Sequence, residues 1–197
     1  MVFLALKRKI IEIHDEDGYR AFLEKLPLYR SALFSHTVFE IRSEVHGSRI
    51  RDIEAALNIK GRRALVAFLH DRASDIIDEY NEAQGIYCKY EDGKCEDPKH
   101  QRFKNGCCCH CYLQSSTGCH TKNLACKLFF CDFKAAQHEF LGMEKIDLLR
   151  LFTRSQRLIA RENIYASRGE NIALLTIGSY LIFCIYSLFK LFRMKNI

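Results

Sequence analysis

Apolar residues recur with a helical period over most of the first 84 residues. Tyr19, Phe22, Leu23 and Leu26 lie three or four positions apart, which predicts a helix, and Pro27 is expected to interrupt it. From Phe34 to Val45 the apolar positions fit either a strand or a second helix, so this stretch has two interpretations.

Two more helices are predicted before residue 84. Gly47–Ser48 marks a turn in which Ser48 is a suitable N-cap, and Ile50, Ile53 and Ala56 follow on one face. A longer helix is expected from about Gly61 to Ala83. Its predicted apolar face consists of Leu65, Phe68, Leu69, Ala73, Ile76, Ile77 and Tyr80.

The last third of the chain also has helical periodicity. Residues 135–166 are typical of one or two amphipathic helices, with leucines on one face and Arg150, Arg154, Arg157 and Arg161 among the polar positions. Residues 172–189 follow, a stretch of 18 residues without a charge.

An 18-residue helix would be about 27 Å long, close to the thickness of a bilayer core. Lys190, Arg193 and Lys195 follow the stretch and suit phosphate head groups, so residues 171–192 predict a transmembrane helix that acts as a C-terminal anchor. The alternatives are a buried core helix and a helix that self-associates through residues 172–189, where Gly178–Ser179 would allow close packing.

Cysteine dominates the middle of the chain. Residues 85–131 contain nine of the ten cysteines and four glycines, a composition typical of tight loops with little apolar surface to bury. Cross-links through metal ions or disulfides would have to hold such a segment together. The Cys108-x-x-Cys111 spacing lets one turn present two sulfurs to one ion.

The order of charges at the N-terminus bears on the choice between metal and disulfides. The apolar residues precede Lys7–Arg8–Lys9, the reverse of a signal peptide, so we expect the chain to stay in a reducing compartment. This favours metal binding, although disulfides and buried thiols remain open alternatives.

Zinc is the favoured cofactor and an iron–sulfur cluster is the alternative. The predicted metal ligands are Cys88, Cys95, Cys107, Cys108, Cys111, Cys119, Cys126 and Cys131, and the adjacent His110 and His120 are weaker candidates.

The same cysteines carry a resemblance to a known family. Gly106-Cys107-Cys108, Cys111-Tyr-Leu, Gly118-Cys119 and Cys126-Lys-Leu-Phe-Phe-Cys131 resemble the bacterial CxxCxxCC family of zinc- or iron-chelating domains. The resemblance covers about residues 88–131 and implies metal binding. It departs from the family pattern where Cys88 and Cys95 lie well before Cys107, and where Leu124–Ala125 replaces Arg–Pro.

A second stretch resembles a DNA-binding motif. Residues 50–69 fit a helix-turn-helix in which Lys60, Arg62 and Arg63 would lie near the start of the second helix, where such motifs contact DNA. Glu54 departs from the motif because that position normally holds a small residue. The alternative interpretation is two core helices with a basic, solvated edge.

The sequence therefore predicts a mainly α protein. It would comprise a helical region (1–84), a loop-rich cysteine and metal module (85–131), amphipathic helices (132–170) and a hydrophobic C-terminal helix (171–192). The predicted function is metal binding in a structural role, without enzymatic activity, in the cytoplasm or on the cytoplasmic face of a membrane. A nucleic-acid-binding regulator and an iron–sulfur enzyme or electron carrier are the alternatives. The net charge of +6 suits a nucleic acid or an anionic membrane as partner.

Overall fold

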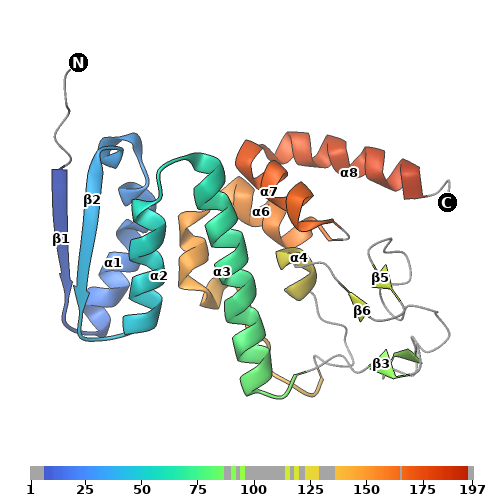
Figure 1. The fold of residues 1–197 in the computed structure, drawn as a ribbon, viewed down its shortest axis with the longest axis horizontal. Coiled ribbons are helices and arrows are strands. Elements are labelled where there is room, and N and C mark those ends of the chain that lie inside the picture. The colour runs from blue at the N-terminus through green and yellow to red at the C-terminus, as the bar shows by residue number, and fades with distance from the viewer. Residues whose placement is uncertain are drawn as a thin grey trace.

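The computed structural model describes residues 7–86, 90–91, 94–95, 114–115, 118–119, 123–128, 136–164 and 166–194. The described residues are mainly helical, which confirms the predicted fold class (Figure 1). The first half comprises β1 (Lys7–Ile13), α1 (Glu16–Tyr29), η1 (Ala32–Phe34), β2 (Thr37–Ser43), α2 (Gly47–Asn58) and α3 (Arg62–Ala83). The short elements that follow are β3 (Tyr90–Glu91), β4 (Lys94–Cys95), β5 (Gln114–Ser115), β6 (Gly118–Cys119) and α4 (Leu124–Lys127). The chain continues with η3 (Met143–Lys145), η4 (Asp147–Leu151), α6 (Arg154–Glu162), α7 (Arg168–Ile177) and α8 (Tyr180–Met194).

The N-terminal part opens with a β-α-β unit that the sequence only half predicted. β1 and β2 pair in parallel from Lys7↔Thr37 to Ile13↔Ser43, and α1 connects them (Figure 1). The stretch from Phe34 to Val45 with two interpretations therefore contains a strand. β1 had no clear signal because it is exposed along most of its length and buries only Ile13 at its end.

Helix α2 covers the edge of β2 that β1 leaves unpaired. The Asn58 side chain accepts a hydrogen bond from the Phe39 amide and donates one to the Phe39 carbonyl, both at 2.9 Å. Glu54 accepts from the Ile41 amide at 2.9 Å. These side chains satisfy backbone groups that an edge strand would otherwise expose. They also explain why Glu54 departs from the helix-turn-helix pattern, because its carboxylate is needed by the strand.

Two local predictions in this region were wrong. Helix α1 continues past Pro27 to Tyr29, since a proline in the last turn removes only one backbone hydrogen bond. Helix α2 begins at Gly47 after His46, which has a left-handed backbone (φ 53°), so Ser48 is not the N-cap. His46 is held in this position by Glu16, 2.7 Å from its Nε2, and by its ring contact with Tyr19.

Helix α3 runs through the centre of the molecule and agrees closely with the predicted helix from Gly61 to Ala83. It contacts α2, α4, η4 and α7 (Figure 1). Its buried face contains Leu65, Val66, Leu69, Ala73 and Ile77 together with two polar residues, His70 and Ser74. The segment expected to form one or two amphipathic helices forms two 3₁₀ turns, η3 and η4, followed by the nine-residue helix α6.

The prediction of a membrane-spanning C-terminal helix was wrong. Gly178 has a left-handed backbone (φ 67°) and divides the apolar stretch into α7, of 10 residues, and α8, of 15 residues. Within the described part of the chain, no helix combines the length and the apolar content that crossing a bilayer requires. The prediction that residues 171–192 act as a C-terminal membrane anchor was therefore wrong as well. Helix α7 instead belongs to the protein core, where Ile172, Leu174 and Leu175 are buried.

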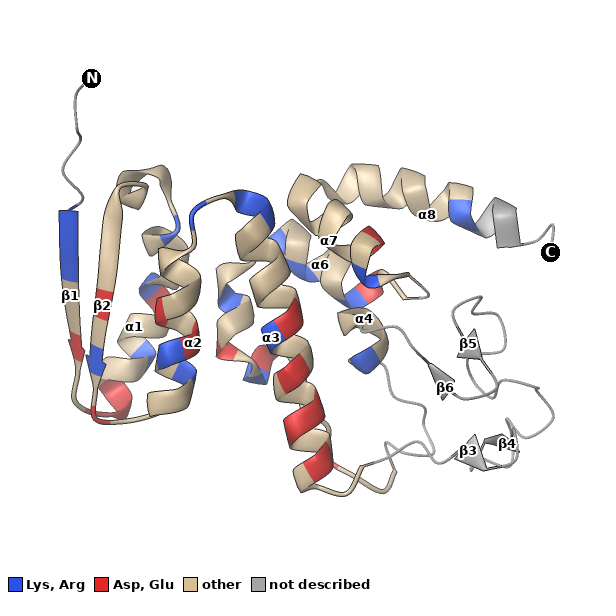
Figure 2. Cartoon of the chain, viewed as in Figure 1, with Lys and Arg blue, Asp and Glu red and all other residues tan. Residues whose placement is uncertain are grey.

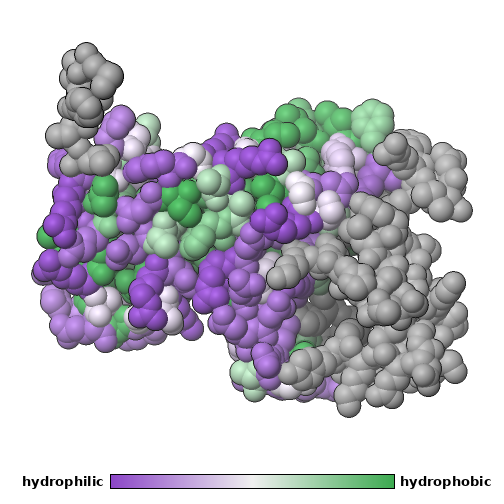
Figure 3. All heavy atoms as spheres, in the orientation of Figure 1, coloured by the Kyte–Doolittle hydropathy of each residue, from purple (hydrophilic) through white to green (hydrophobic). Residues whose placement is uncertain are grey.

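Helix α8 lies along the surface with one face turned inward. Phe183 is buried, while the hydroxyls of Tyr180 and Tyr186 reach Glu162 (2.5 Å) and Glu170 (2.6 Å). The opposite face of α8 is exposed and forms the hydrophobic surface that Figure 3 shows over this helix. The exposed apolar residues of this helix are Leu181, Ile182, Ile185, Leu188 and Phe189. Self-association through residues 172–189 stays a prediction.

Candidate metal module and its attachment to the helical core

Most of the predicted metal ligands lie outside the described residues. This holds for Cys88, Cys107, Cys108, Cys111 and Cys131, and for the weaker candidates His110 and His120. Cys126 lies on α4 and is half-buried. The described residues contain no group of three or more histidine, cysteine or acidic side chains arranged to hold a metal ion. The predicted ligand set therefore stays a prediction.

Two predicted ligands lie on short antiparallel strand pairs. Cys95 on β4 pairs with Tyr90 on β3, and Cys119 on β6 pairs with Gln114 on β5. Each pair brings two backbone segments together within a few residues, as expected for the tight turns predicted from the glycine content. Strands of two residues bury too little surface to be stable alone, so they need a cross-link or a packed neighbour.

Helix α4, which carries Cys126, is fixed to the core by a fully buried asparagine. The Asn123 side chain donates to the carbonyls of Asn163 and Ala166 and accepts from the Ala125 amide, each at 2.8 Å. The last of these bonds caps the N-terminus of α4. A helix of four residues does not form by itself in water, so these contacts position Cys126.

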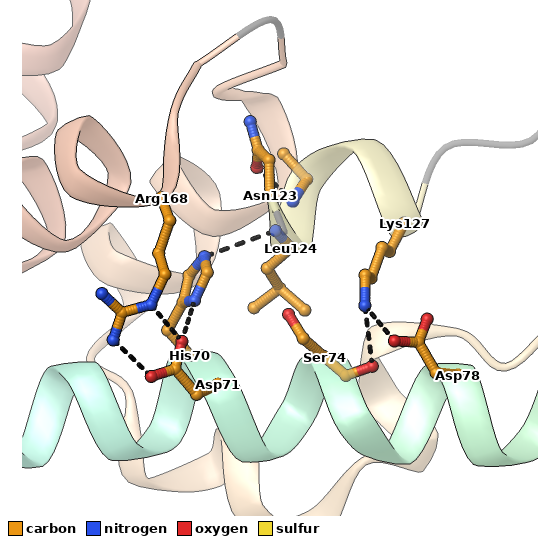
Figure 4. Close-up of polar contacts among 9 residues, drawn as sticks. His70, Asp71, Ser74, Asp78, Asn123, Leu124, Lys127 and Arg168 are labelled. Atoms are coloured by element: carbon orange, nitrogen blue, oxygen red, sulfur yellow. Dashed lines mark hydrogen bonds and ion pairs between the residues drawn. The ribbon is translucent and has the colours of Figure 1, made fainter. Parts of the chain in front are cut away.

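His70 on α3 makes the second contact with α4 (Figure 4). Its Nε2 accepts the Leu124 amide at 3.4 Å, and its Nδ1 lies 3.2 Å from the Asp71 carboxylate. Because the backbone amide can only donate, Nε2 carries no proton and Nδ1 donates to Asp71. Arg168, at the start of α7, in turn donates to Asp71 from its Nε at 2.7 Å. The row of contacts therefore joins α7, α3 and α4 around a neutral histidine.

A third contact holds the C-terminal end of α4. The Lys127 ammonium forms an ion pair with Asp78 and donates to the Ser74 carbonyl at 3.3 Å (Figure 4). Acidic side chains lie along the C-terminal half of α3 (Figure 2), and Asp78 is one of them. Part of the acidic face of α3 is thus used to bind α4.

The entrance to the cysteine-rich region is also fixed on α3. The helix ends at Ala83, Gly85 takes up a left-handed conformation (φ 65°), and the Ile86 amide donates to the Asn81 carbonyl at 2.8 Å. This is a common way to end a helix, and it directs the buried Ile86 side chain back toward the protein. Both flanks of residues 87–122 are consequently attached to the same helix.

Burial lowers the pKa of His70 below its ordinary value of 6.5, although the hydrogen bond to Asp71 acts in the opposite direction. The unfolded chain therefore binds a proton at a pH where the folded protein does not. We expect the contribution of His70 to the free energy of unfolding to fall as the pH drops below 6.5, by at most about 1.4 kcal/mol per pH unit. Urea titrations between pH 5 and 7.5 would measure this slope.

His70→Gln is the matched control for this prediction. Glutamine provides an uncharged oxygen for the Leu124 amide but has no proton to gain, so its slope should be shallower by the contribution of His70. His14, whose pKa is raised by its hydrogen bond to Glu44, is present in both proteins and cancels in the comparison. Equal slopes in the two proteins would contradict a neutral, buried His70.

Sequence reasoning missed both His70 and Asn123. A signal for His70 exists, because it occupies an apolar position in the row Val66, His70, Ala73 and Ile77 on α3. A polar residue at such a position must have partners inside the protein. No comparable signal marks Asn123, since its partners come from residues 163 and 166, some 40 positions away.

Two of the three residues predicted to contact nucleic acid donate hydrogen bonds to backbone carbonyls of the protein itself. Lys60 donates to the Thr37 carbonyl at 3.0 Å, and Arg62 donates to the Ile177 carbonyl at the end of α7 at 2.9 Å. Arg63 is exposed and makes no ion pair within the described residues. The geometry therefore agrees better with two core helices and a basic edge than with a DNA-reading surface, and DNA binding by these residues stays a prediction.

Comparison of the chain with protein-family models, with curated proteins and with solved structures found no match. The resemblance of residues 88–131 to the CxxCxxCC family accordingly rests on the quoted cysteine spacing alone.

Proposed function

We propose that the protein binds zinc through the cysteines of residues 88–131, and that the ion folds this region against the helical core. The observation that carries the proposal is the density of cysteines between two attached ends. Seven cysteines occur in residues 87–122, and the chain is fixed to α3 at Ile86 on one side and at Leu124 and Lys127 on the other.

The two attachments favour a structural role for the proposed metal. Closing a loop between two fixed ends costs less entropy than closing it in a free chain, so anchoring the flanks favours assembly of the thiolate ligands. The cysteines also exceed the four that one tetrahedral zinc ion uses, so two closed sites fit better than a catalytic site with an open position. Cys126 is held next to the His70 contact, which links metal binding to the packing of α4 on α3.

Elemental analysis of protein purified without oxygen tests the proposal. We expect a colourless protein with at least one zinc ion per chain. Cys108→Ser together with Cys111→Ser should reduce the zinc content by at least one ion, because one turn would lose both of its ligands. The matched control is Cys184→Ser, which removes a half-buried thiol on α8 outside the cysteine-rich region and should leave the zinc content unchanged.

Three outcomes would contradict the proposal. Protein that contains neither zinc nor iron would exclude metal binding, and disulfides found by mass spectrometry would show that the cysteines cross-link directly. A brown protein with visible absorption would replace zinc by the iron–sulfur alternative.

A further inference from the structure

A groove of about 530 Å³ lies beside α4 and has a strongly basic rim. Four arginines line it, Arg150 at the end of η4 and Arg154, Arg157 and Arg161 on α6, together with a single carboxylate, Glu144. Leu128, at the end of α4, also lines it and places it next to the attachment of the cysteine-rich region. We call this feature the arginine groove; it is distinct from the predicted metal ligands and from Lys60, Arg62 and Arg63.

The charges in the arginine groove are not balanced within the described part of the protein. Arg161 lies 3.1 Å from Glu162, and Arg150 lies 3.6 Å from Asp147. Arg154 and Arg157 are exposed and make no ion pair with any described residue. Figure 2 shows basic residues on α6 in blue. The groove therefore presents two guanidinium groups whose donors are available to an anion.

The spacing of these arginines is not explained by the stability of the helix. Positions 154, 157 and 161 are three and four residues apart and share one face, where like charges weaken a helix. They span about 10 Å along the axis, which is long enough to contact more than one phosphate group. Guanidinium groups bind phosphate oxygens in pairs, so a row of this kind suits a ligand with several phosphates.

Helix α6 is held rigidly, so the row keeps its shape. Thr153 and Gln156 form reciprocal hydrogen bonds at the start of the helix, with distances of 3.0 and 3.2 Å. The buried Gln156 side chain also donates to the Leu175 carbonyl at 2.7 Å. Because the backbone of α6 is already fixed, a ligand has to order only the arginine side chains.

The floor of the groove is apolar. Leu149 is buried beneath it, and Leu158 and Met143 are half-buried along it. An apolar floor beside a row of arginines suits the flat, weakly polar face of a base attached to phosphates, and the volume is that of a small-molecule site. We propose that the arginine groove binds a nucleotide, with phosphates on Arg154 and Arg157 and the base on the apolar floor, either as a free nucleotide or as one unit of a single strand.

Binding measurements on the full-length protein test this site. The probes are ATP, inorganic pyrophosphate and a fluorescent single-stranded RNA of 12 nucleotides, titrated at 50 mM and 200 mM salt. We expect nucleotide binding that Arg154→Ala together with Arg157→Ala weakens at least tenfold. For the RNA, this variant should also flatten the dependence of the logarithm of affinity on the logarithm of salt concentration by about 1.4, the value for two lost phosphate contacts. Glu144→Gln should tighten binding severalfold, a gain that a folding defect cannot produce.

The matched control is Arg20→Ala together with Lys25→Ala, which removes the same charge from exposed positions on α1, outside residues 50–69. It should change the affinity less than twofold. ATP binding without RNA binding identifies a free nucleotide as the ligand, and tighter RNA binding identifies a single strand. The proposal is overturned if neither ATP nor RNA binds at 50 mM salt, if the control weakens binding as much as the groove variant, or if pyrophosphate binds as tightly as ATP.

Discussion

Asn123→Ala should lower the free energy of unfolding by about 4 kcal/mol. The substitution removes three hydrogen bonds of 2.8 Å inside the protein and leaves the carbonyls of Asn163 and Ala166 and the amide of Ala125 without this partner. Each buried polar group left unpaired costs about 1–3 kcal/mol, and loss of a buried network is among the changes with the largest effects on stability. Urea unfolding of the purified protein would measure the loss.

Asn81→Ala is the control for this prediction. The Asn81 side-chain oxygen is buried without a hydrogen-bond partner in the described structure, and alanine is a better helix former, so this change should alter stability by less than about 0.5 kcal/mol. Asn123→Asp should be no better than alanine, because a carboxylate would face two carbonyl oxygens. A loss below about 1 kcal/mol for Asn123→Ala would show that α4 is not fixed as described.

The same variant links stability to the proposed function. Helix α4 carries Cys126, one of the predicted ligands, and depends on Asn123 for its cap and its position. If the cysteines bind zinc, Asn123→Ala should therefore also weaken zinc binding, whereas Asn81→Ala should not.

Gly178→Ala should lower the free energy of unfolding by about 2–3 kcal/mol. Gly178 has a φ of 67°, a conformation that costs a residue with a side chain about 1–2 kcal/mol. An added Cβ would also lie 2.5 Å from Nη2 of Arg62, the nitrogen that donates to the Ile177 carbonyl at the end of α7. Displacing the guanidinium would remove that hydrogen bond, worth about 1 kcal/mol or slightly more.

A double-mutant cycle separates the two contributions at Gly178. In an Arg62→Ala background the clash is absent, so Gly178→Ala should cost about 1 kcal/mol less than in the natural chain. Gly169→Ala is the matched control, because Gly169 lies in the first turn of α7 with nothing closer than 4.0 Å, and alanine there should be neutral or slightly stabilising. A cost at Gly178 no larger than at Gly169 would contradict the described break between α7 and α8.

Local sequence patterns predicted α3, whose apolar positions recur regularly along one face. The prediction of a helix from about Gly61 to Ala83 was confirmed within one residue, because its apolar positions recur over six turns without a proline or an internal glycine. β2 was recognised only as one of two interpretations. Its identity depends on pairing with β1 and on side chains of α2 that complete its free edge.

The sequence by itself determined that the chain is mainly helical and that cysteine is concentrated in one segment, since both properties follow from composition and local periodicity. Only the tertiary structure decided that residues 172–189 form two helices. These residues contain no charge, but the break depends on Gly178 adopting a left-handed backbone that Arg62, 116 positions earlier in the chain, packs against. The hydrogen-bond partners of Asn123 and His70 were likewise known only from the tertiary structure. Hydrogen bonds between distant segments produce no periodic pattern in the sequence.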